Sequence, residues 1–105
     1  MEESRIRLFE LTIQGNGNYN DTSVQKGLYR VWAIPSQKYD GRRKDSRCLE
    51  RIEVEKHQLL PKKKTKITQI FELSDERSIG IALRQGLPNL ILYNLKRRLG
   101  ENIYF

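Results

Sequence analysis

Residues 65–83 read TKITQIFELSDERSIGIAL, and along them the apolar spacing changes from that of a strand to that of a helix. Ile67, Phe71 and Leu73 stand at alternating positions, a period of two that predicts a β-strand with these side chains on its buried face. Ser74 is followed by two acidic residues, as expected for an N-cap and the first turn of a helix. The stretch therefore predicts a fold in which strands come first and helices follow.

Two structures compete directly after this boundary. Ile79, Ala82 and Leu83 would share one face of a helix over residues 75–85, with the glycine that follows as its stop signal. The same segment also alternates, as a strand over residues 78–83 would. We favour the helix, because the residues before it have the pattern of a helix start.

A second helix is predicted over residues 88–99. Pro88 suits the first helical position, and the basic last turn suits the negative end of the helix macrodipole. Apolar residues recur every four positions, a stripe that is typical of a surface facing the core. The alternative is that the stripe and the C-terminal tail contact a second copy or another partner. The residues of that alternative interface are Ile91, Leu95, Leu99, Tyr104 and Phe105.

Three more strands are predicted upstream, over residues 5–14, 28–34 and 48–60, each bounded by turn-forming or polar segments. In the fourth strand, Gln69 and Ile70 interrupt the alternation, which points to a bulge. Short connections favour antiparallel neighbours. The predicted fold class is α+β, as one domain over residues 1–105: a four-stranded antiparallel meander (5–14, 28–34, 48–60, 65–73) followed by one or two C-terminal helices packed on one face.

The strand over residues 28–34 is apolar on both faces, as expected of a central strand or of one that faces a ligand. Trp32 therefore has two interpretations. It is either a core residue under the C-terminal helices, or an exposed aromatic residue beside Arg30 that stacks on bases. On the strand over residues 48–60, alternation predicts a buried face and a solvated face. The buried face has Ile52, Val54 and Leu60, and the solvated face has Arg51, Glu53, Glu55 and His57.

The composition excludes several classes of protein. The chain has 105 residues and a single cysteine, Cys48, so it forms no internal disulfide. No apolar run approaches the roughly 18 residues of a membrane-spanning helix. The N-terminal Met-Glu-Glu-Ser lacks the basic and apolar regions of a secretory signal. These features predict an intracellular protein, in the cytoplasm or nucleus, that is not secreted and has no membrane partner.

Few residues carry catalytic or metal-binding chemistry. His57 is the only histidine, and its odd separation from Cys48 places the two on opposite faces of one strand. A zinc site needs about four suitably spaced ligands, and the sequence has no such set. We therefore expect no metal, no cofactor and no enzymatic activity. A metal-independent ribonuclease that uses Arg, Lys, Tyr and His57 is a minor alternative.

The positive charge is concentrated in one quarter of the chain. Of the formal net charge of +7, residues 41–66 contribute +6, from ten basic and four acidic residues. This basic segment indicates an anionic partner. Phosphate neutralisation by Lys and Arg, combined with aromatic stacking, points to nucleic acid. The candidate nucleic-acid-binding residues are Arg30, Trp32, Arg42, Arg43, Lys44, Arg47, Lys62, Lys63, Lys64 and Lys66.

Four strands followed by a helix is an order similar to that of PUR-type and Whirly-type single-strand nucleic-acid binders, which usually act as dimers. The similarity concerns topology and includes no shared motif. It implies a nucleic-acid-binding protein or a subunit of a nucleoprotein complex, with a homodimer as one assembly. The alternative is a protein–protein interaction module, such as a viral or accessory factor. Its basic segment would contact an acidic protein, and its C-terminal helix or tail would supply apolar anchors. The sequence does not distinguish DNA from RNA, or single from double strands.

Overall fold

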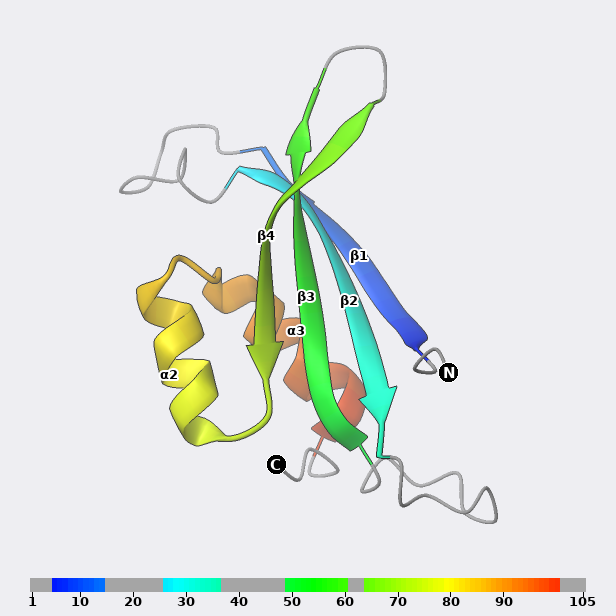
Figure 1. Cartoon of the computed structure of the whole chain (residues 1–105), viewed down its shortest axis with the longest axis vertical. Coiled ribbons are helices and arrows are strands. Elements are labelled where there is room, and N and C mark those ends of the chain that lie inside the picture. The colour runs from blue at the N-terminus through cyan, green and yellow to red at the C-terminus, as the bar shows by residue number, and fades with distance from the viewer. Residues whose placement is uncertain (1–4, 15–25, 37–48, 61–63, 101–105) are drawn as a thin grey trace.

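A computed structural model describes residues 5–14, 26–36, 49–60 and 64–100 of the protein. In this part of the chain, four strands form one antiparallel sheet in the order β1-β2-β3-β4, and two helices follow (Figure 1). The predicted α+β fold and its meander are therefore confirmed. The elements are β1 (Ile6–Ile13), β2 (Gly27–Pro35), β3 (Leu49–Leu59), β4 (Thr65–Leu73), α2 (Glu76–Arg84) and α3 (Asn89–Leu99).

The core lies between the sheet and the helices. In Figure 1, α3 crosses behind the sheet and α2 runs beside β4. We call this side of the sheet the helix-covered face and the opposite side the helix-free face. Alternating strand residues point to the helix-covered face and meet the inward residues of the helices. The buried members of the core are Phe9, Tyr29, Val31, Ala33, Ile52, Val54, Phe71, Leu73, Ala82, Leu87, Ile91 and Leu95.

The segment after β4 is a helix, as favoured, and its N-cap is Asp75 instead of Ser74. The Ser78 N–H donates to Asp75 Oδ1 at 2.7 Å, and the Asp75 N–H donates to Ser78 Oγ at 2.9 Å. This reciprocal pair is a capping box, which satisfies N–H groups that a helix start leaves without partners. Gly86, with a φ of +104°, follows the end of α2 and provides the predicted stop.

The apolar stripe of α3 faces the core. Ile91 and Leu95 are buried, and Leu99 packs against the same cluster. The core interpretation therefore holds for these residues, and Ile91 and Leu95 offer no surface to a second copy. Pro88 was predicted to be the first residue of this helix and is instead its N-cap, because α3 begins at Asn89. Gly100, with a φ of +57°, ends the helix.

The inward residues of β3 are as predicted, except at its end. Ile52 and Val54 are fully buried, whereas Leu60 lies beyond the strand and is 36% exposed. The Leu60 N–H donates to the Lys64 carbonyl oxygen at 3.2 Å. Leu60 therefore belongs to the β3–β4 connection and does not continue the buried face.

A bulge in β4 overturns one predicted burial. Lys56 pairs with Gln69 and His57 with Ile67, so Thr68 is an extra residue, directly before the interruption at Gln69 and Ile70 that predicts a bulge. Because of this extra residue, the β4 residues before Thr68 point to the side of the sheet opposite to the one that alternation predicts. Ile67 was predicted to be buried and is instead 46% exposed, on the helix-free face.

Candidate functional site

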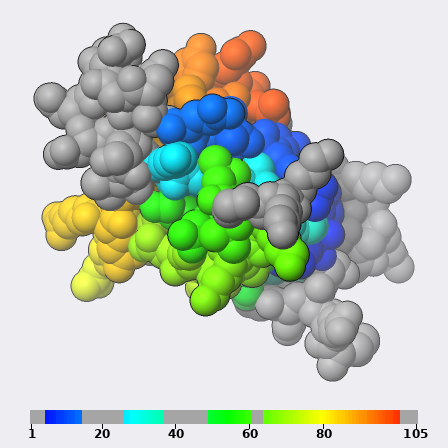
Figure 2. Space-filling view, turned by 90° about the horizontal axis from the view of Figure 1, so that it is seen from above, coloured from blue at the N-terminus to red at the C-terminus, as the bar shows by residue number. Residues whose placement is uncertain are grey.

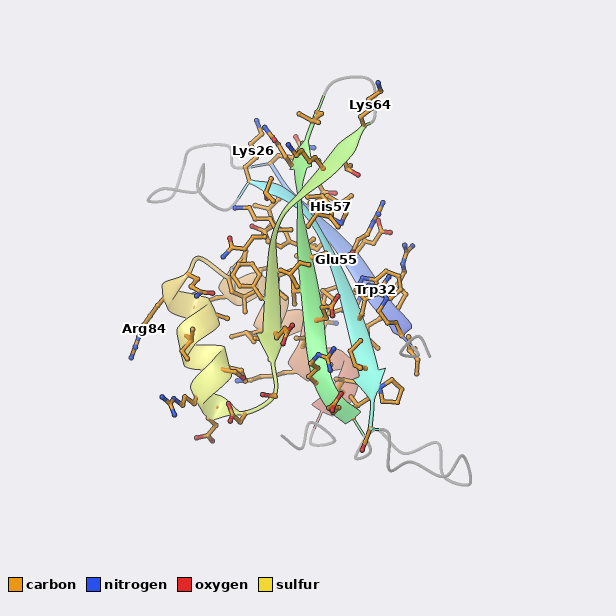
Figure 3. The ribbon with its side chains drawn as sticks, in the orientation of Figure 1. Lys26, Trp32, Glu55, His57, Lys64 and Arg84 are labelled. Carbon is orange, nitrogen blue, oxygen red and sulfur yellow. The ribbon has the colours of Figure 1, made fainter. Side chains whose placement is uncertain are left out.

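The helix-free face carries a cluster of polar and aromatic side chains centred on Glu55. The register pairs Trp32 with Glu53 and Arg30 with Glu55 across β2 and β3. Because residues two apart on a strand share a face, Glu53, Glu55 and His57 all lie on the Trp32 side of the sheet. Figure 3 shows Trp32, Glu55 and His57 on neighbouring strands in front of the helices.

The Glu55 carboxylate has three side-chain partners. Trp32 Nε1 donates to Glu55 Oε1 at 3.1 Å, and Arg5 Nη1 donates to Glu55 Oε2 at 3.2 Å. His57 Nε2 lies 3.3 Å from Glu55 Oε1. Because an ionised carboxylate can only accept, His57 donates here through its Nε2–H. The carboxylate is thus held in place by residues of β2, β3 and the segment before β1.

These partners also determine the charge of Glu55. Burial raises the pKa of the carboxyl, while the hydrogen bonds from Trp32, His57 and Arg5, together with the charge of Arg5, lower it by more. The net pKa lies below the ordinary value for glutamate, so Glu55 is ionised at neutral pH. The side chain is only 10% exposed. Glu55 is therefore a fixed, largely buried negative charge on the helix-free face.

Trp32 is half-buried under arginines. Arg5 Cζ lies 4.0 Å from the indole centroid and Arg7 Cζ lies 5.1 Å from it. Arg5 Nη1 also lies 3.4 Å from Glu53 Oε1. Trp32 points away from the helices, so its interpretation as a core residue under them is wrong. Stacking of a base on this ring requires Arg5 to move first.

Other arginines of the helix-free face are paired with carboxylates as well. Arg7 Nη1 lies 2.8 Å from Glu10 Oε1, and Arg30 Nε lies 3.4 Å from the same oxygen. Arg30, a predicted phosphate contact, therefore shares the single negative charge of Glu10 with Arg7. A phosphate would have to displace this carboxylate to bind Arg30.

The predicted solvated face of β3 is wrong for two residues. Glu55 is 8% exposed and His57 is 4% exposed. The register places Arg30 and Ile70 on either side of Glu55, and Leu28 and Ile67 on either side of His57. The His57 Nδ1 is buried and has no hydrogen-bond partner among the described residues. A general base needs a nitrogen that the substrate can reach. This geometry gives no support to the ribonuclease alternative.

A separate group of basic residues lies where β3 and β4 join. Lys26, Lys64 and Lys66 are exposed, and we call them the lysine end. Figure 3 shows Lys26 and Lys64 at the same end of the sheet, and Figure 2 looks down onto that end. Within the described residues, no ion pair joins these three lysines to an acid. They contrast with the compensated arginines of the helix-free face.

The structure thus separates the predicted site residues. Arg30 and Trp32 lie near Glu55, whereas Lys64 and Lys66 lie at the lysine end. The remaining predicted binding and tail residues fall outside the described residues. They are Arg42, Arg43, Lys44, Arg47, Lys62, Lys63, Tyr104 and Phe105.

The sequence analysis did not identify Arg5, Glu53 and Glu55 as site residues. A signal was present, because period-two alternation places Glu53 and Glu55 on one face of β3. What alternation does not show is that this face and Trp32 lie on the same side of the sheet. That information is in the pairing of Trp32 with Glu53.

The described residues contain neither a metal-binding cluster nor a membrane-spanning helix. In that part of the chain, no group of three or more His, Cys, Asp or Glu side chains is placed to hold a metal ion. None of its helices combines the length and the apolar character needed to cross a membrane. Comparison with protein-family models, curated proteins and solved structures finds no match to the chain.

Proposed function

We propose that the protein binds nucleic acid through phosphate contacts of its basic segment, residues 41–66, and that the lysine end belongs to this surface. The observation that carries the proposal is the contrast between two sets of cations. Lys64 and Lys66 are exposed, with no described acidic partner, whereas Arg5, Arg7 and Arg30 are each paired with a carboxylate. Only the first set can neutralise a phosphate without first losing a salt bridge.

The binding mechanism is phosphate neutralisation with release of counterions. Lysine is a compact point charge on a flexible stem, so it contacts phosphate without demanding a particular geometry. Base stacking on Trp32 is not part of the resting arrangement, because Arg5 covers the indole at 4.0 Å. We therefore expect affinity that depends strongly on salt and little on sequence.

The test is fluorescence anisotropy with labelled single- and double-stranded DNA and RNA, titrated at about 50 and 200 mM salt. In Lys64→Gln/Lys66→Gln, the slope of log affinity against log salt should become less steep. If both lysines contact phosphate, the change is roughly 1.4 for single strands and roughly 1.8 for duplex DNA. Both side chains are exposed, so the variant should unfold like the native protein.

The matched control is Arg84→Gln/Lys96→Gln, which also removes two exposed positive charges but from α2 and α3. It should leave the salt slope nearly unchanged. An equal change in both variants would mean that net charge, and not the lysine end, governs binding. Absence of binding at the lower salt would refute the proposed function.

A further inference from the structure

One contact on the helix-free face has the form of a bound ligand. The guanidinium of Arg5 stacks on Trp32 at 4.0 Å, and its Nη1 reaches Glu53 at 3.4 Å and Glu55 at 3.2 Å. An aromatic face beside carboxylates is the combination that recognises a guanidinium group, through cation–π attraction and charge-assisted hydrogen bonds.

The two sides of this contact are unequally buried. The side chains of Glu53 and Glu55 are 15% and 10% exposed, whereas that of Arg5 is 39% exposed. The acceptors are therefore part of the sheet surface, and the cation lies on top of it. Arg5 also precedes the paired part of β1, whose register begins at Ile6. Arg5 can leave without opening the sheet.

One of the two acceptors has further side-chain partners that hold it without Arg5. Glu55 is also held by the Trp32 Nε1–H and by His57, whereas the β2–β3 register fixes the backbone of Glu53 opposite Trp32. A binding site whose groups are already oriented loses little conformational entropy when a ligand arrives. If Arg5 left, two poorly solvated carboxylates would face the indole, and such charges need a cation.

From this geometry we propose that Trp32, Glu53 and Glu55 form a guanidinium-binding site for an arginine side chain of a polypeptide partner. In the structure, Arg5 of the same chain occupies the site. The partner's arginine replaces Arg5 and takes over its stacking and its two carboxylate contacts. We call this the Trp32 site. It is separate from the lysine end, and it binds a cation where the proposed nucleic-acid surface binds an anion.

The chemistry favours arginine over lysine. A guanidinium is planar, weakly hydrated and able to lie flat on an indole while its N–H groups reach carboxylates at the ring edge. An ammonium group is strongly hydrated and has no flat face to stack. Arg7 Cζ, at 5.1 Å from the indole centroid, adds a positive charge beside the site. This charge repels a cationic ligand, so only a ligand that contacts both the ring and the carboxylates should bind.

Trp32 is the only tryptophan in the chain, so its fluorescence reports on this site alone. The experiment uses the full chain with Arg5→Ala, which removes the guanidinium that contacts Glu53 and Glu55. The ligands are the capped peptides acetyl-Gly-Arg-Gly-amide and acetyl-Gly-Lys-Gly-amide, with free arginine as a third arm. We expect a saturable change with the arginine peptide, with Kd on the order of a few millimolar.

Three comparisons make the expectation specific. The lysine peptide should bind at least about tenfold more weakly, for the reasons of shape and hydration given above. The native chain should also bind the arginine peptide at least about tenfold more weakly, because Arg5 competes at a high effective concentration. Free arginine should bind no more tightly than the capped peptide.

Two variants in the Arg5→Ala background locate the ligand. Glu53→Gln removes one of the two carboxylates and should weaken the arginine peptide severalfold. Glu72→Gln is the matched control: Glu72 pairs with Glu53 across β3 and β4 but is 64% exposed and has no contact with Arg5 among the described residues. It should leave the affinity nearly unchanged.

The proposal is overturned if the folded Arg5→Ala chain, checked by circular dichroism, shows no saturable change, or if both peptides bind equally. Tighter binding of free arginine than of the peptide would refute a polypeptide partner. If Arg5→Ala does not fold, Arg5→Lys serves instead. It keeps the charge but stacks poorly, so the arginine peptide should bind it more tightly than it binds the native chain, and equal affinity would contradict the site.

Discussion

Glu55 illustrates how one residue can be both a structural and a recognition group. Its carboxylate is ionised although it is 8% exposed, because Trp32, His57 and Arg5 each place a donor beside it. Hydrogen bonds to an ionised group contribute about 1.5–3 kcal/mol, more than those between neutral groups. The stability that depends on Glu55 should therefore depend on pH.

We predict that Glu55→Gln lowers the free energy of unfolding at pH 7 by about 1–3 kcal/mol. The pKa of Glu55 is lowered in the folded chain. A lowered carboxyl pKa contributes stability above the ordinary glutamate pKa of about 4.3, and this contribution is lost as the pH falls through the folded value. The difference between the variant and the native chain should thus shrink below about pH 4.

Urea unfolding at pH 7, 5 and 3 measures this difference. Glu72→Gln is the control, because Glu72 lies on the same face but its side chain is 64% exposed. It should change the free energy of unfolding by less than about 0.5 kcal/mol. A Glu55→Gln effect of the same size at every pH would show that the charge of Glu55 is not what stabilises the fold.

Tyr29 gives the opposite pH dependence. It is fully buried on the helix-covered face, and burial raises the pKa of its phenol to about 12. The unfolded chain ionises this group near pH 10, so stability is complete below pH 10 and is lost as the pH rises toward 12. The loss is on the order of 2–3 kcal/mol, because a tenfold difference in acidity between the folded and unfolded chains corresponds to about 1.4 kcal/mol.

We predict that Tyr29→Phe makes the free energy of unfolding less dependent on pH between 10 and 12. Tyr93→Phe, at an exposed residue, should keep the alkaline decline of the native chain. Unfolding by urea at pH 8, 10 and 11.5 tests both variants. The prediction fails if the two variants lose stability in parallel.

At the level of elements, two glycines should respond to alanine substitution in opposite directions. Gly27 begins β2, has a φ of +157°, and a Cβ placed there would lie 2.9 Å from the His57 carbonyl oxygen. Gly80 lies inside α2, and a Cβ there would have no atom within 4 Å. The first glycine is required by the close approach of β2 to β3, while the second only weakens its helix.

We predict that Gly27→Ala lowers the free energy of unfolding by about 1–3 kcal/mol, since a backbone oxygen must move away. Gly80→Ala should raise it by about 0.5–1 kcal/mol, because alanine favours the helix. Thermal unfolding of both variants checks the signs. Changes of the same sign would contradict either the β2–β3 approach or the helical state of α2.

The elements themselves were largely predictable. Each strand was predicted within one residue of its observed bounds, because apolar alternation and turn residues are local signals. The helical state of α2 followed from its start, although the N-cap moved from Ser74 to Asp75. The bulge at Thr68 was less predictable, because the broken alternation marked a region and only the pairing with β3 located the residue.

On the scale of the whole molecule, the choice of face was not predictable. β2 carries apolar residues on both sides, so alternation does not reveal which side the helices cover. The helices cover the side of Tyr29 and Val31, which leaves Trp32 on the helix-free face. Only then do Arg5 and Glu55, which are 50 residues apart in sequence, meet over the indole. Lys64 and Lys66 needed no such information, because their position follows from the β3–β4 hairpin, whereas Lys26 joins them only through the pairing of β2 with β3.

This architecture predicts two independent surfaces. Trp32 pairs with Glu53, and the lysine end begins where Leu59 pairs with Thr65. Six residues along β3 correspond to about 20 Å. That distance is about twice the screening length of roughly 8–10 Å at moderate salt. We therefore predict that Arg5→Ala and Lys64→Gln/Lys66→Gln change the free energy of unfolding additively, within about 0.5 kcal/mol.

The same combination tests whether bases reach the indole. If nucleic acid is bound by phosphate contacts alone, the Lys64→Gln/Lys66→Gln change in salt slope should be equal with and without Arg5→Ala. If a base stacks on Trp32 once Arg5 is gone, Arg5→Ala should tighten binding of single strands and quench Trp32 fluorescence. The anisotropy and fluorescence titrations therefore distinguish a sheet with two separate binding surfaces from one continuous surface that Arg5 divides.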